Sequence, residues 1–126
     1  MKSLNKSVTK ILNFNKVRGW DPAAGYLAKS IMIEAAELLE HFQWDESSKS
    51  RKGVKEKDWD EVALEAVDVF WYLVSFCNKA GIDLNVALEK KLKILEVKYP
   101  EKMFNGKHND KFYKSQKLKY RKNRNK

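Results

Sequence analysis

Residues 30–44 read Ser-Ile-Met-Ile-Glu-Ala-Ala-Glu-Leu-Leu-Glu-His-Phe-Gln-Trp, and residues 61–72 read Glu-Val-Ala-Leu-Glu-Ala-Val-Asp-Val-Phe-Trp-Tyr. Both stretches are rich in helix-forming residues, and their apolar side chains recur at helical spacing. Each stretch also carries carboxylates at positions where a core helix would ordinarily carry leucine or alanine. Acids embedded in two apolar helices indicate a functional site.

The acids of each stretch gather on one side of the predicted helix. In the first helix Glu34 falls in the apolar stripe, and Glu37 lies about 60° away from it around the helix axis. In the second helix Glu61, Glu65 and Asp68 follow at intervals of four and three residues, so they share one face. The rest of the second helix is apolar, and we expect it to be buried on most sides in a bundle.

Carboxylates on two packed helices repel each other in a low-dielectric site and need protons or a cation. Mg²⁺ meets this need because it prefers oxygen ligands and leaves positions for water and substrate phosphates. The simpler alternative is a solvated acidic face, but two acidic pairs without interleaved Lys or Arg favour a shared cation. A di-iron bundle would need Glu-x-x-His on two helices, and the second helix has no histidine.

Composition predicts one helical domain with a basic end. The chain of 126 residues is 43% hydrophobic, has two prolines and shows no sustained β-type alternation, so we expect an all-α, four-helix bundle-like fold. Residues 102–126 hold ten Lys and Arg against Asp110 alone, whereas residues 1–101 hold sixteen residues of each sign. We therefore divide the chain into a helical domain, 1–104, and a basic, flexible tail, 105–126.

Three signals in the sequence predict where the helices begin and end: apolar residues at helical spacing, N-cap residues, and a glycine or proline that ends a helix. Asp58 and Asp83 are the expected N-caps of the third and fourth helices, and Gly81 and Pro100 end them. The polar loop between the second and third helices could act as a lid beside the acidic cleft. The predicted helices cover residues 3–17, 23–42, 59–80 and 84–99.

Two further features bear on location and partners. The chain shows no secretory signal and no apolar run of membrane-spanning length, and Cys77 is its single cysteine, so we expect a cytoplasmic protein without disulfides. The tail mixes basic residues with Phe112, Tyr113 and Tyr120, which suits nucleic-acid binding. A solvated, frayed terminus over residues 117–126 is the simpler interpretation.

Taken in order, several motifs resemble the MazG-like all-α nucleotide pyrophosphohydrolases, especially the small single-domain branch that includes dCTP pyrophosphatases. The resemblance covers about residues 10–100. The motifs are Arg18-Gly-Trp20, residues 33–44 (IEAAELLEHFQW), residues 65–72 (EAVDVFWY), Gly81-Ile-Asp-Leu84 and Lys98-Tyr-Pro100.

This resemblance implies hydrolysis of a nucleoside triphosphate to a monophosphate and pyrophosphate, with Mg²⁺ or, in its place, Mn²⁺, as part of nucleotide-pool housecleaning by a homodimer or homotetramer. It implies that the metal ligands are Glu34, Glu37, Glu65 and Asp68. It also implies substrate contacts, with aromatic residues at the nucleotide pocket and basic residues at the phosphates: Trp20, Trp44, Tyr72, Lys91, Lys98 and Tyr99. Glu37 is our hypothesis for the general base that orients the attacking water.

The chain departs from the family pattern at three places. Ile33 stands where the wider family has a second acid, and Leu95 stands where an asparagine is expected. The His and Pro that follow Trp20 in the dCTP branch are missing, and Trp20 itself could be a hydrophobic plug or a stacking platform. The rival functions are a non-catalytic module that binds nucleic acid through the basic tail, and a pure oligomerisation bundle.

Overall fold

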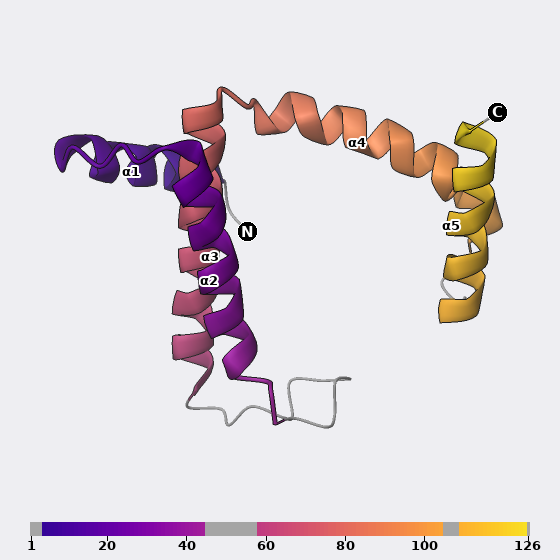
Figure 1. The fold of residues 1–126 in the computed structure, drawn as a ribbon, viewed down its shortest axis with the longest axis horizontal. Helices are drawn as coiled ribbons and strands as arrows, with labels where there is room; N and C mark the ends of the chain where they lie inside the picture. Colours follow the sequence, from indigo (N-terminus) through magenta and orange to yellow (C-terminus); the bar gives the residue numbers. More distant parts are fainter. Residues whose placement is uncertain (1–3, 45–57, 105–108, 126) are drawn as a thin grey trace. The chain divides into compact units, whose positions relative to one another are not determined.

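The computed structural model describes residues 4–44, 58–104 and 109–125, and every regular element in these ranges is helical (Figure 1). This confirms the all-α prediction, and each of the four predicted helices begins and ends within two residues of its expected position. The α-helices are α1 (Leu4–Val17), α2 (Ala24–Glu40), α3 (Trp59–Ala80), α4 (Leu84–Lys98) and α5 (Asp110–Arg124), and a 3₁₀ turn, η3, spans Glu101–Met103. The proposed lid, the polar loop over residues 45–57, lies outside the described residues.

The chain divides into two compact units, Met1–Ile82 and Asp83–Lys126. None of the helices described combines the length and the apolar composition that a membrane span requires. The functional division at residues 104 and 105, which we drew from charge, stays a prediction.

In the first unit α2 and α3 run side by side in opposite directions, and α1 crosses near the start of α2 and the end of α3 (Figure 1). The apolar stripe predicted for α2 faces α3: Leu27 is buried, and Ile31, Leu38 and Phe42 are half-buried. From α1 the core receives Ile11. The buried residues from α3 are Val62, Val74, Ser75 and Cys77.

Helix α3 is less buried than its apolar sequence predicted. Leu64 is 65% exposed, Val67 47% and Leu73 38%, although the helix is apolar nearly all round. The reason is that α1 and α2 are the described helices that pack extensively against α3, and they cover only part of its circumference. The prediction that α3 is buried on most sides is therefore wrong for the single chain.

The helix ends follow the predicted chemistry with one exception. The Asp83 side chain caps α4 by accepting hydrogen bonds from the backbone N–H groups of Asn85 and Val86. Gly81 ends α3 in the left-handed conformation, with φ of 67°. Asp58 precedes α3, but its side chain makes no capping hydrogen bond because its backbone is already helical instead of extended.

An aromatic cluster holds the second unit together where the end of α4, η3 and α5 meet. The ring centroid of Phe104 lies 5.7 Å from that of Tyr99, 5.2 Å from that of Phe112 and 5.5 Å from that of Tyr113. Each such aromatic pair contributes about 0.5–1.5 kcal/mol beyond the burial of its surface. The cluster therefore ties α5 to the end of α4.

Helix α5 differs from the frayed terminus expected over residues 117–126, because the chain is helical up to Arg124. The Asn109 side chain begins this helix by accepting a hydrogen bond from the Phe112 backbone N–H, 3.1 Å away. Phe112, Gln116 and Tyr120, spaced four residues apart, are half-buried along one side of it. Aromatic packing on that side, which charge counting does not register, explains the difference.

Candidate metal centre and adjoining pocket

Three of the predicted metal ligands converge between α2 and α3. Glu34 and Glu37 are one turn apart on α2, and Glu65 lies on α3. One carboxylate oxygen from each residue lies within 4.8 Å of the other two. Clustered carboxylate oxygens are the ligands that Mg²⁺ and Mn²⁺ prefer in proteins.

The environment of the cluster disfavours the charged form of Glu34. Partial burial raises the pKa of Glu34, and the neighbouring charges of Glu37, Asp68 and Glu65 raise it further. The Oε2 atom of Glu65 is buried and has no hydrogen-bond partner within the part of the chain that the structure describes. A buried unpaired oxygen is costly, and a bound cation would satisfy it, so these residues fit a divalent metal ion.

Asp68, the fourth predicted ligand, stands at the edge of this cluster. Its side chain is exposed, and it is not one of the three acids whose oxygens lie within 4.8 Å of one another. Its charge nevertheless reaches Glu34, whose pKa it helps to raise. Glu61, which shares the predicted acidic face, is exposed and also outside the cluster.

The raised pKa of Glu34 predicts that, without a bound cation, the contribution of this residue to stability falls as the pH rises. The folded state holds the Glu34 proton more tightly than the unfolded state does. Its contribution is therefore fully present below the unfolded pKa and is lost as the pH rises through the folded pKa. In thermal unfolding with a chelator from about pH 4 to pH 7, Glu34→Gln should gain stability over the wild type as the pH rises. A difference in Tm that stays constant with pH would contradict this.

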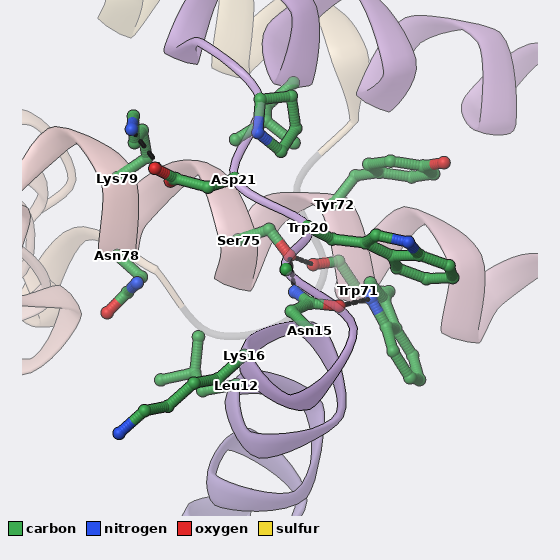
Figure 2. A pocket seen from close by; sticks show the side chains of 13 residues that line it. Leu12, Asn15, Lys16, Trp20, Asp21, Trp71, Tyr72, Ser75, Asn78 and Lys79 are labelled. Atoms are coloured by element: carbon green, nitrogen blue, oxygen red, sulfur yellow. Dashed lines mark hydrogen bonds and ion pairs between the residues drawn. The ribbon is translucent and has the colours of Figure 1, made fainter.

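A pocket of about 460 Å³ lies among α1, the turn after it and the C-terminal half of α3 (Figure 2). Trp20 and Tyr72, both predicted to contact the nucleotide, line it together with Trp71 and Leu27. The volume and the mixture of aromatic walls with a few polar groups are typical of small-ligand sites. Tyr72 is half-buried, and Trp20 is 57% exposed at the mouth.

A hydrogen-bonded network not foreseen from the sequence forms one wall of the pocket (Figure 2). Asn15 Nδ2 donates to Ser75 Oγ at 2.9 Å, and Trp71 Nε1 donates to Asn15 Oδ1 at 3.0 Å. Ser75 Oγ in turn donates to the backbone carbonyl of Trp71 at 2.8 Å. The network joins α1 to α3 and fixes the orientation of the Trp71 indole beside the pocket.

Replacing Asn15 with alanine should lower the free energy of unfolding by about 1–3 kcal/mol, because the part-buried Trp71 N–H loses its acceptor. The matched control is Asn13→Ala, which removes an exposed asparagine from the same helix and should change stability much less. Urea denaturation with an unchanged m-value measures both. Equal losses in the two variants would show that the network contributes nothing.

The turn between α1 and α2 closes one side of the pocket. It contacts the end of α1 and the end of α3. Gly19 adopts a φ of 65°, a conformation that favours glycine. Asp21 Oδ1 accepts a hydrogen bond from Lys79 Nζ at 2.7 Å, which joins the turn to the end of α3 (Figure 2). The Trp20 ring contacts Phe14 edge-on, with 5.7 Å between ring centroids. Trp20 is therefore neither fully buried nor free, and its outer face is open to a ligand.

Of the remaining predicted substrate contacts, one belongs to the first unit and three belong to the second. Trp44 follows α2, is 87% exposed and does not line the pocket. Lys91, Lys98 and Tyr99 belong to the second unit, where Lys91 is exposed. The Lys98 ammonium lies 5.1 Å from the Tyr99 ring centroid and 5.7 Å from that of Tyr120. Roles for these four residues in binding a substrate stay predictions.

Comparisons with known proteins agree with this arrangement. Residues 29–114 match the sequence model of the MazG-like family. The crystal structure of a pyrophosphatase from Archaeoglobus fulgidus is similar, with 38% sequence identity, a TM-score of 0.69, and coverage of 78% of this chain and 93% of that one. A search of curated proteins gave no match. The family match covers both acidic helices, and the chain therefore belongs to the MazG-like family.

Proposed function

We propose that this nucleotide pyrophosphatase hydrolyses a nucleoside triphosphate between the α and β phosphates and requires Mg²⁺, for which Mn²⁺ can substitute. The coarser activity, that of a nucleotide pyrophosphatase, rests on the family and on the similar structure. The observation that carries the finer proposal is the meeting of Glu34, Glu37 and Glu65, one of them with a buried unpaired oxygen, between two helices. We assign residues 1–104 to this function.

The order of residues along α3 supports a nucleotide that spans the acidic cluster and the pocket. Glu65, Asp68, Tyr72, Ser75 and Lys79 follow at intervals of three or four residues, so they form one continuous stripe. From Glu65 to Ser75 this stripe rises about 15 Å. The acidic end would take the metal and the triphosphate, and the aromatic end would take the nucleobase. In this arrangement Trp20 and Tyr72 offer their rings to the base.

The chain's own groups have separate tasks in this proposal. Glu34, Glu37, Glu65 and Asp68 would hold the divalent cation, which when bound neutralises phosphate charge and lowers the pKa of water. Glu37, whose side chain is exposed, would accept the proton of the attacking water at its carboxylate. Lys91 and Lys98 would bind phosphates as point charges, with Tyr99 beside them. Closeness to the dCTP branch is part of the proposal, and the preferred base is left to the nucleotide screen described below.

Exposed apolar residues on both acidic helices support a homodimer or homotetramer. On α2, Met32, Ile33 and Leu39 are more than half exposed, and on α3 Leu64 is 65% exposed. Removing such apolar side chains from water is favourable, and an interface between copies of the chain would bury them. Trp44, which is 87% exposed just after α2, would contact the nucleotide from such an interface.

Product analysis tests the proposed reaction. The protein is incubated with each canonical NTP and dNTP, and with 5-methyl-dCTP, in the presence of Mg²⁺, and the products are followed by ³¹P NMR. We expect a monophosphate and pyrophosphate in equal amounts. Release of orthophosphate with a diphosphate would contradict the assigned bond, and the relative rates identify the preferred base.

A further inference from the structure

The net charge of the protein resides entirely in its second unit. Residues 1–82 hold twelve basic and twelve acidic residues, whereas residues 83–126 hold fourteen basic and five acidic residues. The formal excess of +9 therefore belongs to the second unit alone. Such a concentration of one sign attracts polyanions and is not needed for the neutral first unit to fold.

Helix α5 separates its aromatic and basic residues onto different sides. The aromatic side faces the cluster at Tyr99 and Phe104 described above, and the Lys98 ammonium also lies over its Tyr120 ring. On another side a hollow is lined by Lys111, Lys114, Ser115, Leu118, Lys119 and Lys122. The four lysines around this hollow are exposed. Asp110 is the only acid between positions 102 and 126, so the helix cannot neutralise its own charge.

The chemistry of this basic face distinguishes among polyanions. A membrane-binding helix needs a broad apolar face to insert, and here Leu118 is the only large apolar residue that lines the hollow. Single-stranded nucleic acid is gripped by stacking on exposed aromatic rings, and none of the residues around the hollow is aromatic. Duplex phosphates require only a row of cations on a rigid support.

The dimensions of the helix favour DNA over RNA. Fifteen residues rise about 22 Å, and the major groove of B-DNA, about 12 Å wide, admits an α-helix. The major groove of A-form RNA is too narrow for side chains on a helix to enter. We propose that α5 lies in the major groove of duplex DNA and that its basic face binds the phosphates along the groove, without reading the base sequence. This binding is independent of the proposed pyrophosphatase chemistry.

The test measures binding of the full-length protein to a fluorescein-labelled 20-base-pair DNA duplex of arbitrary sequence over a range of salt concentrations. The variant Lys114→Gln/Lys119→Gln/Lys122→Gln removes three cations from the basic face. The matched control Lys6→Gln/Lys10→Gln/Lys29→Gln removes three exposed cations from α1 and α2 and leaves the same net charge. The α5 variant should bind at least about tenfold more weakly at 0.1 M salt, and its salt slope should be shallower by about 2 to 3. The control should bind like the wild type.

Further variants and further polyanions distinguish duplex DNA binding from the alternatives. An additional variant, Ser115→Lys, adds a cation beside the same hollow and should tighten duplex binding, so the proposal stays testable if the triple variant does not fold. Circular dichroism reports whether each variant folds. Equal weakening in the two triple variants, no duplex binding by the wild type at low salt, or equal or tighter binding of single-stranded DNA, duplex RNA or phosphatidylserine vesicles would overturn the proposal.

Discussion

Replacing Glu65 with glutamine should lower kcat/KM for a nucleoside triphosphate by about a thousandfold. The substitution keeps the size of the side chain and removes the charge at the only cluster acid with a buried unpaired oxygen in the described structure. A metal ion that stabilises transition-state charge supplies several kcal/mol, and about 4 kcal/mol corresponds to a thousandfold in rate. Steady-state kinetics with saturating Mg²⁺ measures the loss.

The control for this variant is Glu61→Gln, one turn earlier on the same helix. Glu61 is an exposed acid outside the three-carboxylate cluster, so its loss changes the net charge equally without touching the proposed metal. It should retain nearly full activity. Wild-type activity in Glu65→Gln, or equal losses in the two variants, would remove Glu65 from the site.

Removing divalent cations should abolish turnover, with a fall of more than about a hundredfold. Carboxylates that repel one another do not hold a triphosphate without a counter-cation, because substrate and site are both negative. Adding Mg²⁺ or Mn²⁺ back should restore the rate, whereas the folded helix content should be the same with and without the cation. The measurement is pyrophosphate release after dialysis against a chelator and into metal-free buffer. A rate that survives this treatment would contradict a metal-dependent reaction.

The convergence of the acids could be predicted from the sequence because it depends on helical periodicity. Glu34 and Glu37 lie one turn apart, and Glu65 lies on a second apolar helix whose acids share one face, so packing the apolar sides brings their oxygens together. The caps of the fourth helix and the glycine that ends the third were predictable for the same reason, because each depends on a few neighbouring residues.

Contacts between residues far apart in the chain could not be predicted. Asn15 meets Trp71 and Ser75 across 56 and 60 positions, and an asparagine at the end of an amphipathic helix carries no signal of its partner. The exposure of Leu64 depends on how much of α3 its neighbours cover, which composition does not determine. Helix α5 was missed because its aromatic side packs against Tyr99 and Phe104, whereas its charge alone indicates a solvated end.

The most direct test of the account is a titration with Mn²⁺ in the absence of nucleotide, with free Mn²⁺ followed by electron paramagnetic resonance. The wild type and Glu61→Gln should bind Mn²⁺ with the same affinity, whereas Glu34→Gln and Glu65→Gln, one from each helix, should each weaken binding by at least about tenfold. Mn²⁺ binding that is unchanged when either cluster acid is replaced would show that α2 and α3 do not share a metal ion.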